Sequence, residues 1–160
     1  MSLLKVNEIQ NTSGNSDITN VGKILQFKYA EMTGGDFSMN STTITDIPGL
    51  TNTMTLTSAS NNTLVTVSVN PYMGGTGNGR YNLKIYRDSS VVYNEPHLIY
   101  RDGAFKAARS HHRYLDTGVS DTSSHTYKVS VVRLEGSMAF YLFHDSGAAE
   151  QSMVLEEITS

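Results

Sequence analysis

The chain has 160 residues, of which 38% are hydrophobic and 17% are charged, with a formal net charge of −3 and no cysteine. This length is enough for one domain with its own core, and the lack of cysteine excludes disulfides, zinc–thiolate sites and thiol nucleophiles. The 12 basic and 15 acidic residues form no block of like charge, so we expect neither a nucleic acid nor a membrane as a partner. The sequence shows no signal peptide and no bilayer-crossing apolar run, which predicts a protein made soluble in a cytoplasm.

The first twenty residues differ from the rest of the chain. A short half-apolar stretch carrying Leu3, Leu4, Val6 and Ile9 gives way to a tract over 11–20 that is too polar to pack. We therefore predict an extended N-terminal arm over 1–20 and a single domain over 21–160. The four apolar residues are candidates for anchoring the arm in a groove of another protein. The alternative is a first strand that folds onto its own domain.

From residue 24 onward, short alternating patterns typical of strands are separated by turn signals. Threonine suits a pleated surface, whereas asparagine and glycine suit turns. The predicted strands, in chain order, are Ile24–Ala30, Ser41–Ile47, Thr53–Thr57, Val65–Val69, Tyr81–Tyr86, Val91–Tyr93, Tyr127–Val131, Met138–Phe143 and Ser152–Ile158. Their regular spacing predicts an all-β fold, an antiparallel β-sandwich that is jelly-roll-like.

Three intervening stretches need a separate interpretation. Pro48-Gly49 predicts a turn that ends the second strand. The glycine-rich run Gly74–Gly79 is followed by a strand and by no Gly-Lys-Ser/Thr, so it predicts a flexible hairpin loop in place of a phosphate-binding loop. The nearest approach to a helical pattern is Asp102–Ser110, where one helical turn is an alternative to extended chain.

The run from Met138 to Phe143 is apolar on both faces. Such a pattern predicts a central strand or a strand at a subunit interface. On the second interpretation, the chain forms a trimer. The candidate interface residues are Met138, Phe140, Tyr141, Leu142 and Phe143.

Polar and aromatic residues near loops suggest a ligand-contact surface. The candidates are Tyr72, Asn78, Arg80, His111, His112, Arg113 and Tyr114. Tyrosine is rigid and amphipathic, so it suits both the stacking of sugars and contact with a neighbouring subunit. Both interpretations remain open, with the neighbouring subunit favoured.

The sequence predicts no enzyme, no metal site and no cofactor. His111 and His112 are adjacent, so a regular strand points them to opposite faces, and the same holds for Glu156 and Glu157. No Gly-x-Ser-x-Gly motif is present. A histidine from each of three subunits around a symmetry axis is the remaining way to bind a metal.

The beginning of the chain resembles virion proteins of tailed phages, notably phages of cyanobacteria and other aquatic hosts. Those proteins often begin with Leu-Lys-Val-Asn-x-Ile-Gln-Asn-Thr-Ser-Gly and continue with Gly-Lys-Ile-Leu-Gln, patterns that Leu3–Gly14 and Gly22–Gln26 match. Ser152–Ile158 looks like the final strand of the same proteins. Ser124–Val129 is similar in style to a strand of trimeric jelly rolls of the tumour-necrosis-factor and complement C1q type.

The resemblance implies a phage structural protein on the virion surface, made in the host cytoplasm. Its expected partners are copies of itself in a homotrimer and a capsid or tail protein that receives the arm. With no repeats or heptads for a shaft, it fits a capsid decoration (cement) protein or a short head- or tail-fibre subunit. The alternative function is a receptor-binding tip of a tail fibre that recognises a host-surface glycan.

Overall fold

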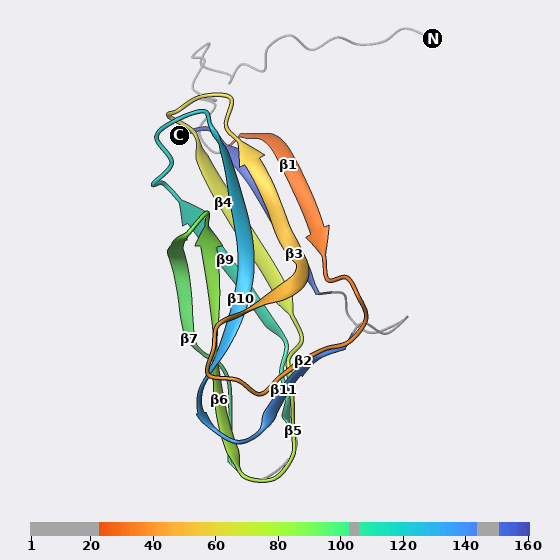
Figure 1. Cartoon of the computed structure of the whole chain (residues 1–160). Coiled ribbons are helices and arrows are strands. Elements are labelled where there is room, and N and C mark those ends of the chain that lie inside the picture. The colour runs from red at the N-terminus through yellow and green to blue at the C-terminus, as the bar shows by residue number, and fades with distance from the viewer. Residues whose placement is uncertain (1–22, 103–105, 144–150) are drawn as a thin grey trace, which may run out of the picture.

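A computed structural model describes residues 23–102, 106–143 and 151–160, and all its regular elements there are β-strands (Figure 1). The strands are β1 (Ile24–Glu31), β2 (Phe37–Met39), β3 (Thr45–Thr55), β4 (Asn62–Val69), β5 (Tyr72–Gly74), β6 (Asn78–Arg87), β7 (Ser90–Asp102), β8 (Lys106–Ala107), β9 (Ser110–Asp116), β10 (Ser124–Gly136), β11 (Ala139–Leu142) and β12 (Ser152–Ile158). This part of the chain contains no helix that could cross a lipid bilayer. The anchoring candidates Leu3, Leu4, Val6 and Ile9 lie outside the described residues.

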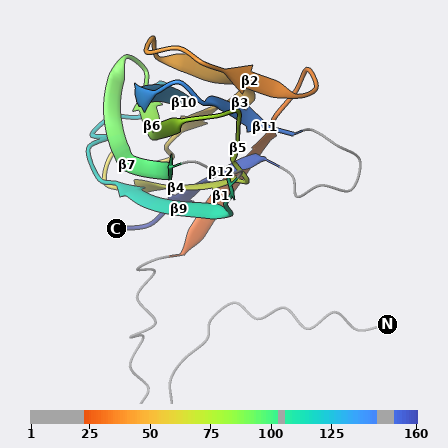
Figure 2. The same ribbon diagram turned by 90° about the horizontal axis from the view of Figure 1, so that it is seen from below.

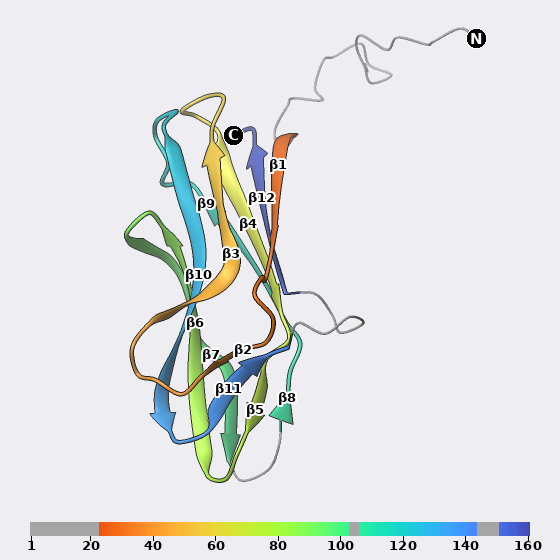
Figure 3. The same cartoon turned by 45° about the vertical axis from the view of Figure 1, so that its right-hand side comes forward.

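The strands form three four-stranded antiparallel sheets. We name them the upper sheet (order β1-β12-β4-β9), the lower sheet (β2-β11-β5-β8) and the facing sheet (β3-β10-β6-β7). Figure 2 shows the upper and facing sheets as two layers, and Figure 3 shows the lower sheet beneath the upper one. The predicted all-β antiparallel sandwich is therefore confirmed.

The upper and lower sheets are two halves of one layer. Each lower strand continues an upper strand along the chain: β1 with β2, β4 with β5, β8 with β9, and β11 with β12. With each such pair counted once, the fold has eight strands, in the order 1-8-3-6 in one layer and 2-7-4-5 in the other. Two four-stranded sheets connected in this way form a jelly roll, as the strand spacing predicted.

The line along which the upper and lower sheets meet, here called the seam, has its own hydrogen bonds. Pro71 lies on it and has no backbone N–H to continue a ladder. The backbone N–H of Ala108 donates to the Pro71 carbonyl oxygen at 2.9 Å, and that of Met32 donates to the Gln151 carbonyl oxygen at 2.9 Å. The Gln151 side chain accepts from the backbone N–H of Asn70 at 2.6 Å. Side-chain and loop hydrogen bonds thus connect the strands where the regular ladder is interrupted.

The core fills the space between the two layers. Val65, Val67 and Val69 of β4 are buried, as their alternation predicted, and so are the inward residues of β6 and β10. Burying one such side chain contributes roughly 1.5–3 kcal/mol. The core residues of β6 and β10 are Tyr81, Leu83, Ile85, Tyr127, Val129 and Val131.

One expectation about local structure was wrong. Pro48-Gly49 does not end a strand: β3 continues through it, and the register against β10 shifts there in a bulge, where Gly49 has a φ of 80°. In the stretch where one helical turn was an alternative to extended chain, the described residues Lys106–Ala107 form strand β8, and β9 begins at Ser110.

The apolar strand Met138–Phe143 occupies a central position, which confirms the first of its two interpretations. β11 lies between β2 and β5 in the lower sheet. Met138, Phe140 and Leu142 have no exposed surface because they fill the core of the same chain. Burial in the core of their own chain accounts for their apolar character. The prediction that these three residues lie at an oligomer interface is therefore corrected. Tyr141 and Phe143 point to the opposite, outer face.

Candidate functional site

The outer face of the upper sheet, the side turned away from the core, carries an unusual set of apolar residues on β1. Leu25, Phe27 and Tyr29 alternate with Gln26 and Lys28, which lie on the opposite side of the strand. Phe27 is 68% exposed and Tyr29 is 47% exposed. The sequence predicted this alternation, and the structure shows that the apolar side is the one open to solvent. Val154 and Leu64 on the neighbouring strands are half-buried members of the same face.

β1 is an edge strand of the upper sheet and lies next to β3 of the facing sheet. The Asn52 side chain of β3 donates a hydrogen bond to the Tyr29 carbonyl oxygen at 2.9 Å, and Gln26 Nε2 donates to the Thr55 carbonyl oxygen at 2.7 Å. These bonds tie the edge strand to the sandwich. The apolar side chains of β1 are therefore held in a fixed row on the surface.

An open depression of about 400 Å³ lies at the seam. Its lining comes from three separate parts of the chain: Asn70, Tyr72, Ala107, Ala108, Arg109 and Phe143. The depression lies where β4 gives way to β5, β8 to β9, and β11 approaches its end. Interruption of the strands is what leaves room here, because a continuous four-stranded sheet presents no such opening.

Three aromatic rings cluster at one side of the depression. The Tyr72 ring centroid lies 6.1 Å from that of Tyr141 and 5.5 Å from that of Phe143, while the Tyr141 and Phe143 rings are parallel with centroids 6.0 Å apart. Tyr72 and Tyr141 are cross-strand partners in the lower sheet. A β-carbon added at Gly74 would lie 3.0 Å from Tyr141 Cε2 and 3.3 Å from Tyr72 Cε1, so glycine lets both rings lie close to the strand.

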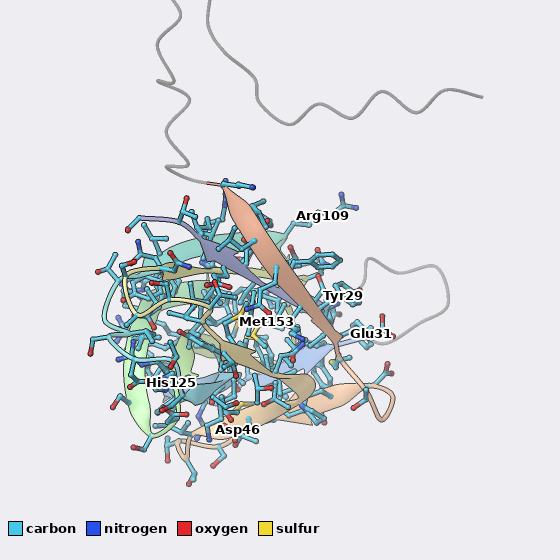
Figure 4. The ribbon with its side chains drawn as sticks, turned by 90° about the horizontal axis from the view of Figure 1, so that it is seen from above. Tyr29, Glu31, Asp46, Arg109, His125 and Met153 are labelled. Atoms are coloured by element: carbon cyan, nitrogen blue, oxygen red, sulfur yellow. The ribbon has the colours of Figure 1, made fainter. Side chains whose placement is uncertain are left out.

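Polar side chains gather on the other side of the depression. Arg109 is exposed, and Figure 4 shows its side chain directed away from the body of the protein. The buried Met153, labelled in the same figure, lies between the layers. Alternation along β9 places His111 and Arg113 on the same outer face as Arg109. The Ser68 hydroxyl is hydrogen-bonded to His111 Nδ1 at 2.8 Å. The depression therefore has an aromatic half and a polar, cationic half.

The structure separates the ligand-contact residues predicted from the sequence. Tyr72, His111 and Arg113 share the outer face of the upper and lower sheets. His112 and Tyr114 point to the opposite face of β9, as predicted for adjacent histidines. Asn78 and Arg80 lie on β6 of the facing sheet, away from the depression. Sequence reasoning missed Asn70 and Arg109. The available signal was their position in the chain, since Asn70 directly precedes Pro71 and Arg109 directly follows Ala107 and Ala108.

His112 belongs to a second polar group, on the rim between β9 and β7. Its Nε2 atom is hydrogen-bonded to the Ser110 hydroxyl at 2.5 Å, and its Nδ1 atom to the Tyr93 hydroxyl at 3.2 Å. Tyr93 also donates to Glu95 at 3.1 Å. Burial lowers the pKa of His112, and His111 adds to that effect while Glu95 opposes it. The order of hydrogen bonds, serine–histidine–tyrosine–carboxylate, resembles the relay of a hydrolase with a tyrosine inserted before the carboxylate.

The surroundings of this second group favour a structural role. Glu95 Oε2 is 4.0 Å from His112 Nδ1, too far for a direct hydrogen bond. In this part of the chain the depression at the seam is lined by Ala107 of β8 and by Ala108 and Arg109 between β8 and β9, whereas Ser110 and His112 of β9 point inward. The group joins β9 to β7 across the open side of the sandwich. Within the described residues, no three histidine or carboxylate side chains are placed to hold a metal ion.

Comparison with known proteins gives little similarity in sequence. No protein-family model matches the chain, and no curated protein matches it. Its fold is similar to part of dimeric latent PorU from Porphyromonas gingivalis, with a TM-score of 0.46 and 12% identity over 94% of this chain. It is also similar to part of a structure from infectious bursal disease virus, Gt strain, with a TM-score of 0.47 and 8% identity over 87% of this chain. The chain spans 14% and 39% of those two proteins, respectively.

Proposed function

We propose that this chain is a non-enzymatic structural subunit of a tailed-phage particle, attached to the virion surface through its N-terminal arm. Its role is that of a capsid decoration protein or a short fibre subunit, and its working form is a homotrimer. The resemblance of Leu3–Gly14 and Gly22–Gln26 to the start of phage virion proteins supports this function. The jelly-roll fold is compatible with it, since viral capsid domains use this fold among other proteins.

One structural observation carries the proposal: the exposed apolar row Leu25, Phe27 and Tyr29 lies on the strand that follows the arm. Large contiguous apolar patches on soluble proteins mark sites of association. Fully burying an exposed apolar side chain contributes roughly 1.5–3 kcal/mol, and covering these partly exposed side chains contributes part of that amount. The row thus provides a docking surface that follows the predicted anchor in the sequence, and it replaces the buried Met138, Phe140 and Leu142 as the surface on which subunits meet.

Light scattering and particle assembly test this proposal. The full chain should have the mass of three 17.5-kDa chains, and a chain lacking residues 1–20 should fold and trimerise but fail to join particles. A wild-type mass of one chain overturns the trimer. A truncated chain that does not fold shows that the arm belongs to the domain, and one that still joins particles shows that the arm is not the anchor.

The second candidate function is recognition of a host-surface glycan at the tip of a tail fibre. The observation that favours it is the exposed aromatic cluster of Tyr72, Tyr141 and Phe143 beside the depression at the seam. Copy number in purified particles separates the two functions, because a decoration protein covers the capsid in many copies and a fibre tip is present in few.

A further inference from the structure

The depression at the seam combines two chemistries that sugars require. A pyranose ring has an apolar C–H face and a rim of hydroxyl groups. Ligand sites generally pair apolar and aromatic walls with a few placed polar groups. Here the walls are Tyr72 and Phe143, and the polar groups are the Asn70 amide and the Arg109 guanidinium.

We propose that this depression binds an acidic sugar, a pyranose bearing a carboxylate, within a surface glycan. This inference rests on the second candidate function, glycan recognition, and assigns it a site and a ligand class. The apolar face of the sugar packs on the aromatic rings, and the carboxylate pairs with Arg109. Arginine is suited to this task because its planar guanidinium donates two parallel hydrogen bonds to a carboxylate.

The charge around the depression favours an acidic over a neutral sugar. Arg109, which directly precedes β9, is the charged residue among the described residues of the lining, and His111 and Arg113 follow it at two-residue spacing on the outer face of β9. Alternate residues on a strand lie about 6.6 Å apart, so the three form a short row along which further acidic units could bind. Among the described residues, the carboxylates on this outer face, Glu31 and Glu156, lie on β1 and β12.

The site is held in place by the fold. The Gln151 side chain accepts a hydrogen bond from the backbone N–H of Asn70 and donates to the Phe143 carbonyl oxygen at 3.4 Å. Gln151 is 3% exposed, so both bonds are sheltered from water. Gly74 lets the tyrosine rings lie over the strand. A preformed site loses less conformational entropy when a ligand binds.

Titration of the purified full chain with two probes tests the proposal: a hexuronic acid tetrasaccharide and a neutral hexose tetrasaccharide of the same length. Binding is followed by NMR. The hexuronate should bind and the neutral sugar should bind at least tenfold more weakly. Arg109→Ala, at an exposed position, should weaken hexuronate binding about tenfold or more, the scale of a charge-assisted hydrogen-bonded pair. Tyr72→Ala and Phe143→Ala should weaken the binding of either sugar.

Matched variants control for general loss of charge or of a ring. Lys84→Ala and Tyr100→Ala change residues on the facing sheet and should leave binding unchanged. If Tyr72→Ala fails to fold, Arg109→Ala and Phe143→Ala decide the result. If the wild type binds the neutral sugar as tightly as the hexuronate, or if Arg109→Ala binds the hexuronate as tightly as the wild type does, the acidic-sugar assignment is overturned. If hexuronate binding persists in all site variants, the site is wrong although glycan recognition stands; if neither sugar binds, this inference is wrong and the proposal of a structural subunit is untouched.

Discussion

Arg87 and Asp116 form a salt bridge that joins the two layers of the sandwich. Arg87 Nη1 on β6 lies 2.7 Å from both carboxylate oxygens of Asp116, the last residue of β9. The Tyr127 hydroxyl donates to the same carboxylate at 2.8 Å, and the backbone N–H of Gly118 donates at 3.0 Å. Asp116 is 1% exposed. A buried carboxylate with three donors thus connects the facing sheet to the upper sheet.

Replacing Asp116 by asparagine should lower the free energy of unfolding by about 3–5 kcal/mol, because the change leaves a partly buried guanidinium without its counter-charge. Urea denaturation followed by circular dichroism measures this loss. Glu135→Gln is the matched control, since its partner Arg80 is 3.5 Å away and both side chains are partly exposed; it should cost about 1 kcal/mol or less. Equal effects of the two substitutions would show that the buried pair adds no more stability than the exposed pair.

Glu157 should make the protein sensitive to acid. Its side chain has no exposed surface and accepts hydrogen bonds from Asn61, Thr57 and Gln26 at 2.6–2.7 Å. Burial raises its pKa, but these hydrogen bonds outweigh burial and hold the pKa below the ordinary value of 4.5. A carboxyl group whose pKa is lowered by folding stabilises the protein at pH values above its unfolded-state pKa. That stabilisation is lost as the pH falls through the folded-state pKa.

The melting temperature should therefore fall as pH decreases below about 4.5. Glu157→Gln should be less stable than the wild type at neutral pH and should show a smaller decrease on acidification. Thermal unfolding between neutral and acidic pH, for both proteins, measures the difference. Parallel pH curves for the two proteins would assign the acid sensitivity to other carboxylates.

His125 should produce the opposite pH dependence. Its Nδ1 atom lies 2.8 Å from Asp88 Oδ2 and its Nε2 atom 3.1 Å from Asp121 Oδ1. The hydrogen bond with Asp88 raises the pKa of His125 above 6.5; burial opposes this, and Asp121 adds to it. Because the folded-state pKa is raised, the stabilisation is complete below 6.5 and is lost as pH rises through the folded-state pKa.

NMR titration of the His125 ring protons measures that pKa directly. The Asp88→Asn variant should move the midpoint down toward the ordinary value and should remove most of the stability gained on lowering the pH to 6. Asp36→Asn, which changes a carboxylate in the loop between β1 and β2, is the control and should leave the His125 titration unchanged. An unshifted midpoint in Asp88→Asn would contradict the assigned cause.

The sequence predicted those strands whose buried side is apolar. β4 was recognised because Val65, Val67 and Val69 alternate with polar residues. β9 was missed because its inward side chains include His112 and Asp116, which are polar and satisfied by Tyr93 and Arg87 on the other layer. Local periodicity does not reveal a polar side chain whose partner lies elsewhere in the chain.

The candidate site was predicted only in part for the same reason. Tyr72 was singled out as an aromatic beside a loop, but the depression needs Arg109 and Phe143 as well. These residues meet because the strands are interrupted along the seam. There the Gln151 side chain is hydrogen-bonded to the backbone of Asn70 and of Phe143. No short motif in the sequence indicates that these residues lie together, so only the structure shows it.

The apolar row on β1 provides the last prediction. Phe27→Ser should leave the stability of the folded monomer within about 0.5 kcal/mol, because the side chain is 68% exposed and makes little contact with the core. The same substitution should weaken self-association, measured as the concentration dependence of mass in sedimentation, since it removes apolar surface covered in the proposed trimer. Leu134→Ser is the matched control: Leu134 is 41% exposed on β10, away from β1, and its loss should not alter association. If Phe27→Ser associates as strongly as the wild type and Leu134→Ser does not, the docking surface lies on the facing sheet and not on β1.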